Sequence, residues 1–320
     1  MKKYKLLNFD IGISPRFNSF SVGPYQIILA KNYDKLRQKL ERGINVITAY
    51  AKCKDEEQKA ILTASPNENG IWDLCFILSF LLGRRFSFPG HEFNFTHHNS
   101  KGNIVELYQI PNAAKIAWDN RLNLKNEKRP LWYYLDSIDT PIIQYHALYG
   151  CIALEIIQKN ESISLKIACE LKNLIEIVKS IIDESKIDDD SKCNLKSTVG
   201  NWGKSYSSAL KQLLISYDIT SANVSKIQEK RIKFISKIRN DIVHGNKIEY
   251  PKWVVGDEID KEIEYIFISS VFIPSLVKEF LCRAFGLNDF SLVIRNRECL
   301  QEYIYNGTWE GRKISNIIIK

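Results

Sequence analysis

An arginine and a histidine near the end of a predicted helix, Arg239 and His244, are the residues of this chain best suited to chemistry. The planar, permanently charged guanidinium of Arg239 can hold two phosphate oxygens and stabilise charge that develops on them. The imidazole of His244 has an ordinary pKa of roughly 6.5, so it can give or accept a proton near neutrality. The pair therefore suits phosphodiester cleavage. The alternative is an ion-paired surface arginine beside a histidine that caps its helix.

The geometry of a helix limits what one copy of this pair can do. Residues five apart lie about 140° apart around the helix axis, so a single helix end does not form a pocket. A twofold dimer would bring two copies of Arg239 and His244 together in one composite cleft. Carbonyl groups of the last turn favour the protonated form of His244. We therefore expect the histidine to act mainly as an acid or as a stabiliser of charge.

Basic residues precede the pair along the same helix. Lys226, Lys230, Lys233 and Lys237 are spaced by four, three and four residues, which places them on one face. Beside a phosphate site, Lys230, Lys233 and Lys237 are predicted to contact an RNA backbone. The alternative is an ordinary solvated face of the helix.

The elements that must position these residues are predicted to be helices. Apolar residues recur at helical spacing through most of the chain after residue 130, which indicates an all-helical C-terminal domain over 131–320. A polar stretch is expected from 188 to 208, and no role is assigned to 287–320. The predicted helices span 140–160, 162–187, 210–215, 221–244 and 257–284.

The first 130 residues change character every ten to fifteen residues, which predicts a β-rich α+β domain. The polar segment 120–130, closed by a proline, is predicted to be the linker between the two domains. Strands are expected at 4–11, 19–29, 44–50, 86–95 and 104–110, and helices at 33–41 and 70–82. The predicted fold class is therefore α+β, with a helical C-terminal half.

Composition excludes several classes of protein. With 320 residues, 45% of them hydrophobic, the chain can bury a full core, and its net charge of +8 favours polyanionic partners. The start lacks a secretory signal, and seven cysteines without a CxxC pair suit reduced thiols, so a cytoplasmic location is expected. The apolar segments 71–82 and 265–281 are predicted to be buried helices, with no membrane partner. His91, His97 and His98 lack further ligands, and neither metal nor cofactor is expected.

The sequence around the pair resembles a known superfamily. The run Arg239-Asn240-Asp241-Ile242-Val243-His244 matches the R-x4-6-H hallmark of HEPN ribonucleases, with Asn240 as the small polar residue that often follows the arginine. The runs CIALEII (151–157) and ESISLKIA (161–168) resemble the first two helices of the ApeA-like branch. The likeness covers about 140–285. A looser likeness, centred on the run LLGRR (81–85), links the N-terminal part to the β-rich region of that branch.

The resemblance implies a metal-independent endoribonuclease in which the ribose 2′-hydroxyl attacks its own phosphate, leaving a cyclic phosphate and a 5′-hydroxyl. It implies Arg239, His244 and Asn240 as active-site residues and a homodimer formed through the helices that bear them. A role in prokaryotic antiphage defence or as a toxin follows, with a phage-derived trigger or an antitoxin as further partner. The alternatives are a catalytically inactive module that binds RNA or nucleotides, and a toxin silenced by its partner.

Overall fold

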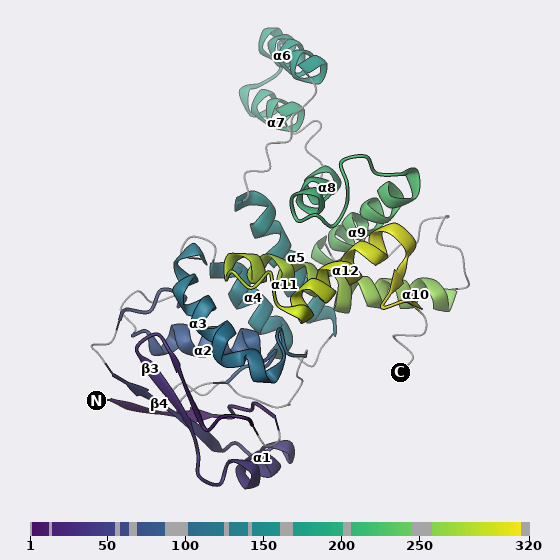
Figure 1. Ribbon diagram of the computed structural model, residues 1–320. Helices are drawn as coiled ribbons and strands as arrows, with labels where there is room; N and C mark the ends of the chain where they lie inside the picture. Colours follow the sequence, from purple (N-terminus) through teal and green to yellow (C-terminus); the bar gives the residue numbers. More distant parts are fainter. Residues whose placement is uncertain are drawn as a thin grey trace.

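The computed structural model describes residues 2–12, 15–54, 58–63, 69–86, 102–124, 128–139, 143–160, 169–200, 206–244 and 258–314. Within them the chain forms one antiparallel sheet near its N-terminus, followed by helices over most of the remaining length (Figure 1). The predicted α+β class is confirmed at this level.

The sheet has four antiparallel strands in the order β1-β4-β3-β2. Alternate side chains of these strands are buried, which is the period-2 pattern of a sheet with one covered face. The segment expected as one strand at 19–29 is a hairpin whose turn contains Gly23, with a φ of +52°. A side chain there would collide with the Trp118 indole. The strands are β1 (Lys3–Leu7), β2 (Ser19–Val22), β3 (Tyr25–Leu29) and β4 (Ile47–Cys53).

Helices cover the inner face of the sheet and adjoin its end. The helices predicted at 33–41 and 70–82 are confirmed as α1 (Tyr33–Glu41) and α2 (Ile71–Leu81). The strand predicted at 104–110 is wrong, because this segment leads through η1 (Leu107–Gln109) into α3 (Ile110–Asp119). Pro111 occupies the first turn of α3, where a missing N–H costs nothing. The strand predicted at 86–95 falls almost wholly outside the described residues.

The segment predicted to be a linker is largely helical. It contains η2 (Arg121–Leu124) and the start of α4 (Lys128–Asp139). Leu124 is fully buried, and the indole Nε1 of Trp132 donates to the carbonyl of Leu62 at 2.5 Å. One hydrophobic cluster extends from strand β1 to the last helix, so apolar packing is continuous across residue 130. The division into domains 1–130 and 131–320 stays a prediction.

The helices predicted around the Arg239 segment are present. Four of them correspond to α5, α8, α9 and the run from α10 to α11, which passes through a π-helical segment, Ile268–Phe272. The segment 287–320, to which no role was assigned, contains α12 and a short hairpin of β5 and β6. The bounds are α5 (Ile143–Asn160), α8 (Tyr206–Ser216), α9 (Lys226–His244), α10 (Glu258–Phe267), α11 (Ile273–Ala284), α12 (Ser291–Asn306), β5 (Thr308–Trp309) and β6 (Arg312–Lys313).

Two further helices, α6 (Cys169–Glu184) and α7 (Asp189–Gly200), pack against each other and project from the other helices (Figure 1). Residues 188–208 were expected to be a polar connection between two helices. This prediction is wrong over α7, because these residues form a helix. The Asp188 side chain accepts a hydrogen bond from the Ser191 N–H at 2.8 Å, which caps this helix without an apolar signal. Leu174 was grouped with the buried stripe of α6, but it is 47% exposed.

The run Glu262–Ala284 is long and apolar enough to cross a membrane by length and composition alone. Of its most apolar window, 61% is buried inside the protein, as expected for a core helix. The shorter apolar helix α2 is also buried, in agreement with the prediction for 71–82. The six cysteines whose side chains the structure describes are all free thiols.

Candidate active site around Arg239

Arg239 lies on the buried side of α9, where this helix packs against α5 and α8. Its Nη2 donates to Oε2 of Glu155 on α5 at 2.5 Å, and its Nη1 donates to Oδ1 of Asn240 at 2.8 Å. The Tyr206 ring of α8 lies below the guanidinium, with 4.6 Å between the guanidinium carbon and the ring centroid. Three helices thus fix the orientation of one side chain.

Helical spacing explains why these residues meet. Ile235 and Ile238 are fully buried, and Arg239 follows them on the same side of α9. On α5, Cys151 is fully buried and Glu155 stands one turn later on the same side. The apolar residues pack the two helices together, and the charged residues pair at the border of this contact. The pair is therefore a consequence of how α5 and α9 pack.

The environment of Arg239 is only partly closed. Its side chain is 11% exposed, whereas that of Glu155 is 33% exposed, so the carboxylate borders solvent. The Nε of Arg239 is buried and has no hydrogen-bond partner among the described residues. A guanidinium has five N–H donors, and the contacts to Glu155 and Asn240 use two of them. The site therefore keeps donor capacity for an anion.

Two titratable groups beside Arg239, the Cys151 thiol and the Tyr206 hydroxyl, stay protonated at neutral pH. Burial raises the pKa of the Cys151 thiol to about 12, with Glu155 adding to the shift and Arg239 opposing it. Burial also raises the pKa of the Tyr206 hydroxyl, and Gln158 is its polar neighbour. Neither group supplies a base or a thiolate nucleophile near neutrality. A group that transfers a proton near neutrality must therefore be another side chain than Cys151 or Tyr206.

His244 is the last residue of α9, five residues after Arg239, as predicted. Its side chain lies outside the part of the chain that the structure describes, as do the predicted stop residues Gly245 and Asn246. Between the two, Asn240 contacts Arg239 directly. Asp241 is buried, with Oδ2 3.5 Å from Nζ of Lys237.

The predicted RNA-binding lysines do not share a face with Arg239. Lys230 and Lys233 are exposed and Lys237 is partly exposed, whereas Arg239 is buried. Their positions on α9 lie about 120° to 180° around the axis from Arg239. Lys233 also lies 3.8 Å from the Glu229 carboxylate. The stripe is outward, and its role in binding RNA stays a prediction. Ile227, expected on the buried side of α9, is 53% exposed.

Two residues of the site, Glu155 and Tyr206, were not singled out from the sequence. A signal for Glu155 exists, because a carboxylate on the apolar side of a predicted core helix needs a cationic partner. Nothing local distinguishes Tyr206 from the other tyrosines of the chain. Only the packing of α8 against α9 places its ring against Arg239.

No group of three or more His, Cys, Asp or Glu side chains suited to a metal ion occurs among the residues that the structure describes. Comparison with protein-family models finds no match, and comparisons with curated proteins and with solved structures find none either. The function must therefore be argued from the site itself.

Proposed function

We propose that the chain is a metal-independent endoribonuclease of the HEPN type, with Arg239 and His244 as its catalytic pair. One observation carries the proposal: Arg239 is held between Glu155 and Tyr206, five residues before His244 at the end of the same helix. An arginine oriented from several sides is suited to bind charge that develops at a fixed position. Asn240, which fixes Nη1, has the accessory role.

The chemistry follows from the donors of the site. Arg239 binds the non-bridging oxygens of the scissile phosphate with the N–H groups that Glu155 and Asn240 leave unused. The ribose 2′-hydroxyl gives its proton to a water molecule while its oxygen forms a new bond to phosphorus, and the bond from phosphorus to the 5′-oxygen breaks. His244 as imidazolium gives a proton to the leaving oxygen, which becomes a 5′-hydroxyl. The other product is a 2′,3′-cyclic phosphate.

Homodimerisation is the part of the proposal that completes the cleft. Because one helix end presents Arg239 and His244 in different directions, a symmetric pair of α9 ends would surround the phosphate from both sides. In such a dimer, a mixture of Arg239→Ala and His244→Ala chains contains heterodimers that keep one arginine and one histidine. We expect these mixtures to regain part of the activity that each variant lacks. If the mixture is no more active than the two variants measured separately, a cleft shared between two chains is excluded.

The direct test is RNA cleavage in excess chelator by wild type, Arg239→Ala and His244→Ala. Removing a preorganised charge donor typically lowers the rate by about 100-fold to 1,000-fold, so each variant should cut at no more than about one hundredth of the wild-type rate. Arg295→Ala is the matched control, since Arg295 is 61% exposed and pairs with Glu310. Cleavage that needs a divalent cation, or that survives both substitutions, would exclude the proposal.

The ion pair with Glu155 also favours a second candidate, an RNA-binding or scaffold module without catalysis. The charge of Arg239 is already met by a carboxylate in this structure, as in a pair that only stabilises the fold. This candidate predicts that wild type binds transfer, ribosomal and messenger RNA and cuts none of them. Among active forms, we propose a cytoplasmic defence protein or toxin controlled by a phage-derived trigger or an antitoxin.

A further inference from the structure

The N-terminal sheet has one face that the helices leave uncovered. The inner face consists of buried apolar residues, whereas the residues between them point to the other side. Strand pairing places the outward residues in two rows across all four strands. One row contains Lys3, Lys52, Gln26 and Ser21, and the next contains Lys5, Tyr50, Ile28 and Ser19. We call these eight residues the outer face.

The outer face is basic and has no acidic residue. The four strands contain Lys3, Lys5 and Lys52 but neither aspartate nor glutamate. None of these lysines has an ion-pair partner among the described residues, in contrast to Lys233 on α9. Lys54 follows β4, and its Nζ lies 3.4 Å from Oγ of Ser21. The acidic run 55–57 comes next in the sequence and lies outside the described residues. Unpaired lysines in rows favour a polyanion as the partner.

An aromatic ring stands among these lysines. The Nζ of Lys3 lies 3.8 Å from the centroid of the Tyr50 ring, and Tyr50 is partly exposed. A cation over an exposed ring stabilises by about 0.5 to 1 kcal/mol. A nucleobase stacked on such a ring contributes about 1 to 3 kcal/mol. A base can therefore take the place of the ammonium, which is then available to a phosphate.

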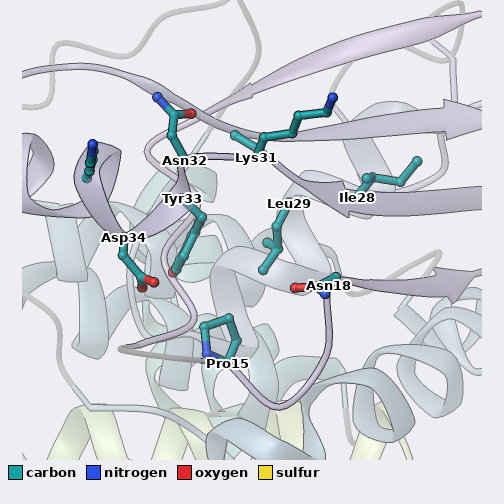
Figure 2. A pocket seen from close by; sticks show the side chains of 10 residues that line it. Pro15, Asn18, Ile28, Leu29, Lys31, Asn32, Tyr33 and Asp34 are labelled. Atoms are coloured by element: carbon teal, nitrogen blue, oxygen red, sulfur yellow. The ribbon is translucent and has the colours of Figure 1, made fainter.

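A hollow of about 820 Å³ adjoins the second row, and Ile28 borders both (Figure 2). Its lining includes the amide side chains of Asn18 and Asn32, together with Lys31 and Asp34. This volume lies within the usual range of small-ligand sites, about 300 to 1,000 Å³. Figure 2 shows Asn18 and Asn32 on different sides of the hollow, and an amide that both donates and accepts, such as that of Asn18, suits the edge of a base. The outer face thus continues into a place where one unstacked base fits.

We propose that the outer face binds single-stranded RNA, with Tyr50 stacking a base and Lys3, Lys5 and Lys52 contacting phosphates. Single strands are favoured over a duplex because stacking on a sheet needs a base that is not already paired. Figure 1 shows the sheet and α9 on opposite sides of the helices α2 and α4, so binding here is separate from the Arg239 site. The purpose of such binding rests on the proposed ribonuclease function, whereas the binding measurement that tests it does not require cleavage.

The test measures binding of a fluorescent single-stranded uridine 12-mer, with full-length His244→Ala protein to prevent cleavage. The triple variant Lys3→Gln, Lys5→Gln, Lys52→Gln should bind at least about tenfold more weakly. Exchange of Lys115, Lys186 and Lys313 for Gln is the matched control, because these lysines are exposed elsewhere, and it should change binding less than about threefold. Circular dichroism and thermal unfolding verify that the variants are folded.

Two further measurements separate stacking from charge alone. Tyr50→Leu should weaken binding about fivefold or more, whereas Tyr50→Phe, which keeps the ring, should bind as the parent does. The logarithm of the binding constant falls linearly with the logarithm of the salt concentration. This slope should be steeper by roughly 2 for the parent protein than for the triple variant, as expected when three phosphate contacts to a single strand are lost. If the wild type binds RNA in this way but does not cut it, the proposed ribonuclease function is excluded and the inference about the outer face still holds. Equal affinity for duplex RNA, an unchanged triple variant, or stronger binding to phosphatidylserine vesicles would overturn the inference.

Discussion

Two arginine–carboxylate sites in this molecule differ in how completely their groups are used. Asp10 is 5% exposed, and both of its oxygens accept hydrogen bonds. Its donors are Nε of Arg37 at 3.0 Å, Nη1 of Arg84 at 2.8 Å, the Tyr33 hydroxyl at 3.0 Å and the Gly12 N–H at 2.8 Å. At the other site, Glu155 pairs with Arg239, and its side chain is 33% exposed.

The difference indicates which site serves the fold and which can exchange partners. Asp10 ties the loop after β1 to α1 and to the segment after α2, and its removal would take this carboxylate from Arg84 and leave Arg37 with Glu41 alone. Glu155 is reached by solvent, and Arg239 keeps N–H groups that neither Glu155 nor Asn240 uses. We therefore expect the Asp10 site to govern stability and the Arg239 site to govern activity.

The largest effect on stability is expected from Asp10→Ala. Removing one partner of a buried ion pair typically costs about 3 to 5 kcal/mol, because the other charge stays buried. Glu41→Ala is the matched control, since Glu41 pairs with the same Arg37 but is 53% exposed, and it should cost about 0 to 1 kcal/mol. Urea unfolding measures both changes. Equal losses in the two variants would remove the structural role that we assign to Asp10.

Glu155→Gln should affect stability less and activity more. Because Glu155 borders solvent, the uncompensated arginine can be hydrated, and we expect a loss of about 1 to 2 kcal/mol in the free energy of unfolding. Cleavage should fall by about tenfold or more in kcat, because Arg239 loses the group that orients it. Glu176→Gln on α6, where Glu176 is 65% exposed, is the control. Unchanged cleavage rates would show that Glu155 does not position Arg239.

The Asp10 site should also contribute to stability in acid. Burial alone would raise the pKa of Asp10, but Arg84, the Gly12 N–H, Arg37 and Tyr33 together lower it below its ordinary value of 3.8. A carboxyl whose pKa is lower in the folded state stabilises fully above pH 3.8, and this stabilisation is lost as the pH falls through the lowered pKa. Asp10→Asn should therefore flatten the fall in stability below pH 4. An equally steep fall in wild type and variant would contradict the assignment.

The smallest effect is expected from the ring below Arg239. Tyr206→Phe keeps the cation–π contact and removes a buried hydroxyl that has no hydrogen-bond partner among the described residues, so we expect the free energy of unfolding to change by less than about 1 kcal/mol. Tyr206→Leu removes the ring as well and should cost about 1 to 2 kcal/mol more. Thermal and urea unfolding compare the two. If Tyr206→Phe lowers the free energy of unfolding as much as Tyr206→Leu does, the hydroxyl and not the ring supports Arg239.

Sequence patterns predicted the elements with strong apolar periodicity. The helices α5 and α9 have repeated apolar spacings and α2 is a nearly continuous apolar run, and the structure places helices at all three. The run Ile104–Ile110 is rich in the β-branched, aromatic and other apolar residues of a strand, yet it leads into α3, which continues through Pro111 and the alanines after it. The polar helix α7 has little apolar signal and was missed, because Val199, its buried apolar residue in the part of the chain that the structure describes, packs against α6.

Only those residues of the candidate site that lie on α9 could be predicted from the sequence. Arg239, Asn240 and His244 are neighbours in the sequence, so a motif reveals them together. Glu155 and Tyr206 stand 84 and 33 positions before Arg239, and only the packing of α5, α8 and α9 joins them. The lysines of α9 were expected beside the site because they precede it, but their angular position turns them outward.

The ends of cleaved RNA test the ribonuclease account most directly. A single-stranded RNA is incubated with wild-type protein and excess chelator, and mass spectrometry identifies the new termini. The account predicts 2′,3′-cyclic phosphate and 5′-hydroxyl ends from wild type, and intact RNA from Arg239→Ala. Ends bearing a 5′-phosphate, or RNA that wild type leaves whole at every concentration tested, would contradict it.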